Sequence, residues 1–219
     1  RTNSVEHVWP QWLARFMNEL PGRNREMNAT ITNAQGQIRT WGRSTAELVT
    51  RCVCVGCNTG WMSALENSTK SILHPMINGQ DAILSGQQQD VIARWMIKTA
   101  MVLDSMGRNK EEIFYEEAEW RQFSENLLLP GHVAFWLGHY SGSYWGGFTS
   151  QRIFRAEGPV KQYRSYILTM AFGQLVMQFA NSKISPPIDE YVAELPKTED
   201  NWSVVEFDPH LDFIGWRSE

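Results

Sequence analysis

The sequence predicts an α+β fold made of two parts, residues 1–83 and residues 84–219. In the first part, strand and hairpin patterns lead into a helix that begins near Asn58. In the second part, a long amphipathic helix precedes an acidic helix and several strand-like stretches between glycine-rich turns. With 219 residues, of which 42% are hydrophobic, the chain can bury a core in one domain or in one small and one medium domain.

The first part opens with a short helix and a hairpin. Pro10 suits the first turn of a helix whose apolar residues have amphipathic spacing, and Pro21-Gly22 ends that helix. Met27–Thr32 and Ile38–Trp41 flank a turn at Asn33–Gln37, where Asn and Gly supply turn conformations. These patterns predict one helix followed by one hairpin.

A third strand is predicted immediately before a cysteine knuckle. Leu48–Val53 has the composition of a strand and leads into Cys54-Val-Gly-Cys57. Trp61, Leu65 and Ile72 then mark one face of a helix that begins near Asn58. The expected order is therefore strand, knuckle and helix.

The second part begins with the clearest helix signal in the chain. Ser85 and Gln88 form a capping-box pattern, and apolar residues repeat at helical spacing from Val91 to Leu103 until Gly107. An acidic helix is predicted next, followed by three strands: Tyr115–Asn126, then Val133–Tyr140, Phe148–Phe154 and Tyr166–Met170. Ala171–Ala180 is apolar and fits either a buried strand or a helix. Pro186-Pro187 begins an extended tail that includes the apolar stretch Val204–Phe207.

The cysteines and the lack of long apolar runs predict a cytoplasmic protein. Cys52, Cys54 and Cys57 lie within six residues of one another, which suits local metal ligation better than a framework of disulfides. No stretch approaches the roughly 20 continuous apolar residues that span a bilayer, and the first residues lack the pattern of a signal peptide. We therefore expect no membrane association.

Charge is unevenly distributed along the chain. The pI of about 5.8 argues against an extended basic surface for nucleic acid. Residues 1–52 nevertheless hold seven arginines and four glutamates, a formal charge of +3, whereas residues 53–219 carry −7. A polyanion should approach the first part, since the planar guanidinium group matches phosphate oxygens. A mixed solvated face explains the same pattern equally well.

Two motifs in the first part resemble those of HNH endonucleases. Glu6-His-Val-Trp-Pro10 resembles their E-H-x-x-P strand, and Cys54-Val-Gly-Cys57-Asn58 resembles their C-x-x-C-N/H element, in the same order. The longer runs Glu6–Leu13 and Cys54–Glu66 resemble a group of bacterial HNH-like proteins, and the similarity continues through Arg94–Met101. The resemblance implies an N-terminal ββα-metal (HNH, treble-clef-like) nuclease module at 1–83 and an accessory α+β domain at 84–219.

The resemblance also implies a catalytic site. Glu6 and Asn58 would bind Mg²⁺ or Mn²⁺, and His7 would be the general base that deprotonates water. Neighbouring residues of a strand point to opposite faces, although a twist at a strand end can bring both towards one site. Asn58 would sit at the start of a helix, where the helix dipole favours a phosphate. The alternative interpretation is that Asn58 only caps this helix.

Cys54 and Cys57 are the candidate ligands of a structural zinc. In zinc-stabilised members of the family, an upstream C-x-x-C completes the four-ligand site, but this chain begins at Arg1. Cys52 is a poor third ligand, and His74 would lie about 25 Å along an unbroken helix. Either the natural protein extends further upstream, which we expect, or packing alone holds the knuckle. A redox role for the C-x-x-C is disfavoured because the region lacks a βαβ pattern.

Trp61 occupies a helix position that is often basic in the family, which puts a phosphate contact there in doubt.

The expected function is metal-dependent hydrolysis of phosphodiester bonds in nucleic acid, with DNA favoured over RNA. The alternative is an HNH scaffold without catalysis that binds nucleic acid or another protein. A third interpretation, by analogy, is an effector whose second part controls the nuclease. Whether the chain forms a homodimer stays open.

Overall fold

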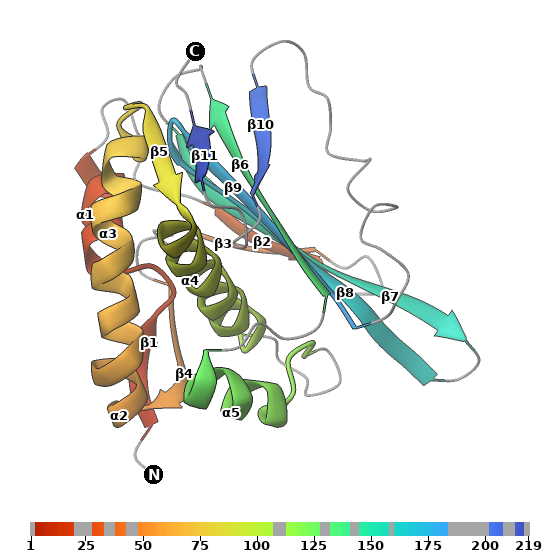
Figure 1. The fold of residues 1–219 in the computed structure, drawn as a ribbon. Helices are drawn as coiled ribbons and strands as arrows, with labels where there is room; N and C mark the ends of the chain where they lie inside the picture. The colour runs from red at the N-terminus through yellow and green to blue at the C-terminus, as the bar shows by residue number, and fades with distance from the viewer. Residues whose placement is uncertain are drawn as a thin grey trace.

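The computed structural model confirms the α+β class, with helices on one face of an antiparallel sheet (Figure 1). It describes these residues: 3–19, 28–32, 38–42, 48–106, 113–127, 132–140, 145–157, 160–183, 202–207 and 213–216. The turn expected at Asn33–Gln37, the helix stop at Gly107 and the start of the tail at Pro186-Pro187 lie outside these residues.

Strand β1 (Asn3–His7) and strand β4 (Val49–Cys54) form an antiparallel pair. Glu6 pairs with Thr50 and His7 with Val49, and the register shifts between Ser4 and Glu6. In the sequence, β1 and β4 are separated by helix α1 (Gln11–Glu19) and the hairpin of β2 (Asn28–Thr32) and β3 (Ile38–Gly42). The helix and the hairpin expected in this region are thus confirmed.

A continuous helical stretch follows β4 directly. It consists of a single turn, α2 (Val55–Cys57), a π-helical turn, η2 (Asn58–Met62), and helix α3 (Ser63–Ile77). The backbone departs from helical geometry at Gly60, with φ −94° and ψ −112°. The stretch begins three residues before the expected start at Asn58, because the Cys54 side chain caps the first turn by accepting a hydrogen bond from the Cys57 backbone N–H.

Helix α4 (Gly86–Asp104) follows strand β5 (Ala82–Ser85) and lies between α3 and the sheet (Figure 1). Its predicted capping box is present: Ser85 accepts from the Gln88 backbone N–H, and the Gln88 side chain accepts from the Ser85 N–H. The acidic helix α5 spans Glu117–Asn126, two residues shorter at its start than expected.

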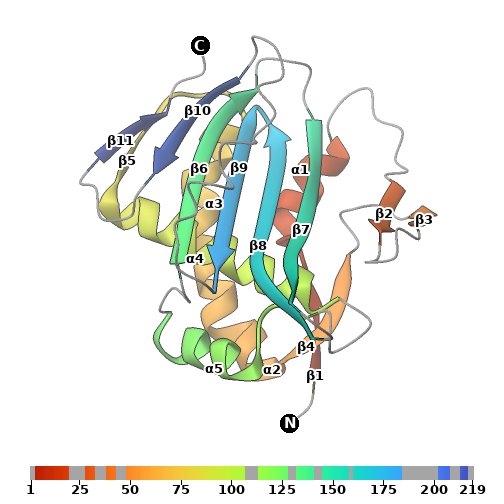
Figure 2. The ribbon, with the colours of Figure 1, turned by 90° about the vertical axis from the view of Figure 1, so that its right-hand side faces the viewer.

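The five-stranded sheet has the order β10-β6-β9-β8-β7, and its neighbouring strands are antiparallel (Figure 2). Its strands are β6 (His132–Tyr140), β7 (Trp145–Glu157), β8 (Val160–Gly173), β9 (Leu175–Ser182) and β10 (Trp202–Phe207). Strand β11 (Phe213–Trp216) pairs with β5 instead. The apolar stretch Ala171–Ala180 is therefore strand on both sides of a tight turn, not a helix.

That turn needs glycine and joins the sheet to α3. Gly173 has a φ of +60°, and a Cβ there would lie 2.2 Å from the Ile77 carbonyl oxygen. The Gln174 N–H donates to the same oxygen at 3.1 Å. The β8–β9 turn thus lies directly against the last turn of α3.

Among the described residues, the larger of two hydrophobic clusters runs through both predicted parts, and the smaller one contains Trp136 and Ala180. The larger cluster includes Leu13 and Leu73 from the first part and Trp95 and Phe172 from the second. The boundary at residue 83 stays a prediction. Among the described helices, none combines the length and apolar character needed to cross a membrane.

Candidate active site

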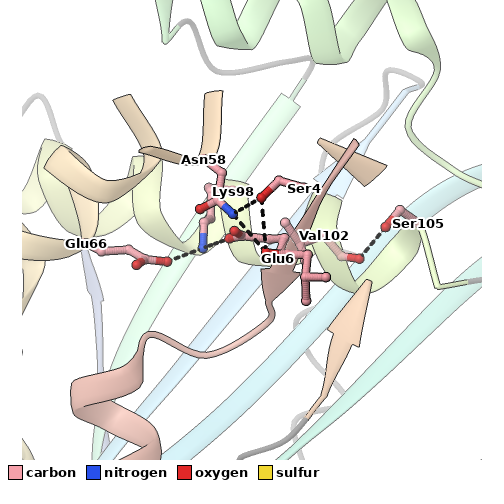
Figure 3. A network of polar contacts seen from close by, with 8 residues as sticks. Ser4, Glu6, Asn58, Glu66, Lys98, Val102 and Ser105 are labelled. Atoms are coloured by element: carbon pink, nitrogen blue, oxygen red, sulfur yellow. Dashed lines mark hydrogen bonds and ion pairs between the residues drawn. The ribbon is translucent and has the colours of Figure 1, made fainter. Parts of the chain in front are cut away.

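Asn58 joins the two sequence motifs in space. Its side-chain amide nitrogen donates to Ser4 Oγ and to the Val5 carbonyl oxygen, each at 2.9 Å (Figure 3). The strand that carries Glu6-His7 and the segment that follows the cysteine knuckle therefore lie side by side, although they are about 50 residues apart. The side chain that caps the first helical turn is that of Cys54, so Asn58 is available for this contact with β1.

Glu6 is buried beside a lysine of α4. Its residue is 3% exposed, and Glu6 Oε1 lies 3.0 Å from Nζ of Lys98, whose side chain is completely buried. Nζ also lies 2.5 Å from Oε1 of Glu66 on α3, whose side chain is 21% exposed. Three charged groups from β1, α3 and α4 thus form one cluster, which we call the Glu6–Glu66–Lys98 cluster (Figure 3).

The electrostatics of Glu6 reflect opposing effects. Burial raises the pKa of its carboxyl above the usual range, and the charge and hydrogen bond of Lys98 offset only part of that rise. The Glu66 carboxylate raises the pKa further, and His7 lowers it. Lys98 is therefore the main group that stabilises the charged form of Glu6.

His7 differs from Glu6 in its surroundings. It is half-buried, whereas the adjacent Glu6 is almost fully enclosed. This difference fits the alternation of side chains along a strand, which points neighbours to opposite faces. Glu6 and Asn58 thus lie on the side of β1 that faces the helices, and His7 is the more accessible of the two motif residues.

Cys54 and Cys57 are brought together by the knuckle. Their sulfur atoms are 3.1 Å apart, and the Cys57 backbone N–H donates to Cys54 Sγ at 3.2 Å. Cys52 is exposed on β4, and His74 is exposed near the end of α3. Within the described ranges, no three or more His, Cys, Asp or Glu side chains are grouped to hold a metal ion. Neither Cys52 nor His74 therefore joins the pair as a third ligand.

Trp61 and the arginines of residues 1–52 are the other features that the sequence analysis singled out. Trp61 packs edge-on against Phe123 of α5, with ring centroids 5.6 Å apart, so it joins two helices. Of the seven arginines in residues 1–52, Arg15 and Arg51 are exposed; Arg1, Arg23, Arg25 and Arg43 lie outside the described residues.

Lys98 and Glu66 were not identified as site residues from the sequence. Lys98 lies at a core-facing position of a helix whose neighbouring positions, such as Trp95 and Val102, are apolar. A lysine at a core-facing position needs a charged partner, so the sequence of α4 could have indicated a buried ion pair at Lys98. It could not identify the partners, because they lie on β1 and α3.

Comparisons of this chain with models of known protein families, with curated proteins and with solved structures find no match.

Proposed function

We propose that this protein is a metal-dependent HNH-type endonuclease that hydrolyses phosphodiester bonds in nucleic acid, with DNA favoured over RNA. The observation that carries the proposal is the pair of hydrogen bonds from Asn58 to β1, beside Glu6 and His7. This contact joins the two motifs that resemble those of HNH endonucleases. Because the two motifs lie side by side, their residues can act at a common site.

The proposed module consists of β1, β4 and the helical stretch 55–77. Two antiparallel strands followed directly by a helix have the connectivity of a ββα-metal unit. In this assignment, α1 and the β2–β3 hairpin are an insertion between the two strands. The pair Cys54–Cys57 then marks the connection from strand to helix, where the family has its zinc knuckle.

The residues fit a divalent cation that takes few protein ligands. Mg²⁺ is usually held by one or two carboxylates, with water and substrate phosphates completing its shell. Glu6 and Asn58 would supply two oxygen ligands. Two carboxylates and one ammonium group give the Glu6–Glu66–Lys98 cluster a formal charge of −1, which favours a cation nearby. The cation would stabilise charge on the phosphate and activate water.

His7 is the proposed general base, a role that requires its side chain to reach around the end of β1 to the side on which Glu6 and Asn58 lie. A neutral imidazole can accept the proton of the attacking water, and His7 is more accessible to substrate than Glu6.

An HNH scaffold without catalysis, which would bind nucleic acid or a protein, is the second candidate. The observation that favours it is the salt bridge between Glu6 and Lys98, which occupies one oxygen of the carboxylate. A cation would have to share Glu6 with this ammonium group.

The test is cleavage by the purified chain. Plasmid DNA and a structured RNA are incubated with Mg²⁺, Mn²⁺ or a chelator, and the products are separated on gels. The proposal expects cleavage that requires the cation and proceeds faster on DNA. Intact substrates under every condition, together with salt-sensitive binding, would favour the scaffold without catalysis.

A further inference from the structure

The three sequence runs that resemble HNH-like proteins meet at one place. Glu6 belongs to the first run, Glu66 ends the second and Lys98 lies in the third, Arg94–Met101. The structure joins these residues in the Glu6–Glu66–Lys98 cluster, with Nζ of Lys98 at the centre (Figure 3). Of these three residues, only Glu6 has a role in the proposed chemistry; Glu66 and Lys98 have none assigned so far.

We propose that Lys98 is a positioning residue for the Glu6–Asn58 site: its ammonium group holds the Glu6 carboxylate in place, and Glu66 holds the ammonium group. The inference rests on the proposed function and extends it to helix α4. It makes Lys98 a residue that acts through Glu6, without contact with substrate.

Burial gives the contact its specificity. A lysine side chain with no exposure to solvent must be paired, because an isolated buried charge is very costly. The ammonium group has three donors arranged around one nitrogen, and here two of them lie towards two carboxylates. With Glu66 fixing one direction, the direction of Glu6 is determined as well.

The backbone around the cluster is also constrained. Lys98 lies on a helix that is packed in the core, and its neighbours Trp95 and Val102 are fully buried. Asn58 holds β1 through Ser4 and Val5, just before Glu6 in the strand. Glu6 is therefore held by its side chain from α4 and by its strand from Asn58. Partners that orient metal ligands in this way typically contribute about 10- to 100-fold to metal affinity or activity.

The test compares Mn²⁺ binding by the full chain and its variants, with free Mn²⁺ measured by electron paramagnetic resonance. Lys98→Met and Lys98→Gln should each weaken binding by about 10- to 100-fold. Lys70→Met, at an exposed position of α3, is the matched control and should bind as the wild type does. Ser85→Ala, which removes the cap of α4 away from the cluster, should lower stability and leave Mn²⁺ affinity unchanged.

A second measurement separates positioning from a general loss of structure. If Lys98 acts through Glu6, then adding Glu6→Gln to Lys98→Met should weaken Mn²⁺ binding by less than about threefold more, since both changes disable the same carboxylate. If the loss of Mn²⁺ affinity in the double variant equals the product of the losses in the two single variants, the two residues act separately and the inference is overturned.

The remaining outcomes are also decisive. Mn²⁺ affinity of both Lys98 variants within threefold of wild type, or higher than wild type, would overturn the inference while leaving a cleaving enzyme as proposed. A wild-type chain that neither binds Mn²⁺ nor cleaves would overturn the proposed function itself. If neither Lys98 variant folds, the wild type with ¹⁵N-labelled lysine decides: bound Mn²⁺ should broaden the Lys98 ammonium signal before that of Lys70, and equal broadening would contradict the inference.

Discussion

Two buried carboxylates illustrate how single residues organise this protein. Glu6 is paired with Lys98, and Asp104 at the end of α4 accepts from Arg152 Nε at 2.6 Å. Asp104 also accepts from the backbone N–H groups of Phe114 and Tyr115, at 2.8 and 2.9 Å. Asp104 thus joins α4 to β7 and to the segment before α5, whereas Glu6 belongs to the proposed active site.

Replacement of His7 by alanine should lower the cleavage rate by about 10² to 10⁴, because a positioned general base contributes this much. His7 is half-buried at the end of β1, so the variant should keep its fold. The measurement is the initial rate of plasmid cleavage, with thermal unfolding followed in parallel. His74→Ala, at an exposed histidine of α3, is the control. Full activity of His7→Ala would remove His7 from the mechanism.

At the scale of elements, local signals define where the helices begin. The capping box at Ser85 and Gln88 starts α4, and the Cys54 side chain starts the stretch that leads to α3. Both side chains satisfy backbone N–H groups that have no partner within the helix.

Removal of the α4 cap in Ser85→Ala should destabilise the protein by about 1 kcal/mol, the usual cost of losing a helix N-cap. Chemical denaturation monitored by circular dichroism measures this change. Ser71→Ala, at an exposed position within α3, should change the free energy of unfolding by less than about 0.5 kcal/mol. Equal stability of the two variants would mean that the capping box contributes nothing measurable.

The cysteine knuckle should bind zinc weakly in the 219-residue chain. Cys54 and Cys57 provide two thiols, and a structural zinc site needs four ligands. A chain extended upstream by a C-x-x-C segment should instead bind one zinc tightly. Elemental analysis of both forms after dialysis against a chelator measures the difference. One retained zinc per 219-residue chain would show that another side chain completes the site.

At the scale of the whole molecule, one core connects the sheet with the helices and contains buried tyrosines. Tyr115, before α5, and Tyr166, on β8, have ring centroids 5.7 Å apart. Burial raises the pKa of both phenols above the usual range, and the charge of Asp104 raises both further, while Arg152 lowers the pKa of Tyr166 in part. Both rings are therefore stable inside the protein only in their neutral form.

This arrangement predicts unfolding at alkaline pH. A phenol whose pKa is higher in the folded than in the unfolded state contributes stability that is complete below about pH 10 and is lost as pH rises above that value. The melting temperature should therefore fall steeply above about pH 10. Tyr166→Phe removes one of these ionisations and should make the decline shallower. A decline of the same slope in Tyr166→Phe would exclude Tyr166 as a cause.

The sequence by itself predicted the features that depend on neighbouring residues. The α+β class, the hairpin, the cap of α4 and most strands follow from side-chain periodicity and turn chemistry, which act over a few positions. The same local reasoning left Ala171–Ala180 undecided, because an apolar run fits a buried strand and a buried helix equally well. Only the turn at Gly173, lying against Ile77, and pairing within the sheet make it strand.

The candidate site divides in the same way. Glu6, His7, Asn58 and the knuckle cysteines were identified from short motifs, whereas Lys98 and Glu66 were found only in the structure. Lys98 belongs to the cluster because α4 packs beside α3 and β1, and no pattern within α4 specifies a partner that is 92 residues away in the sequence. Motifs are recognised from residues that are close in the chain, but a buried charge is matched across the core, so only the tertiary structure decided which carboxylates Lys98 meets.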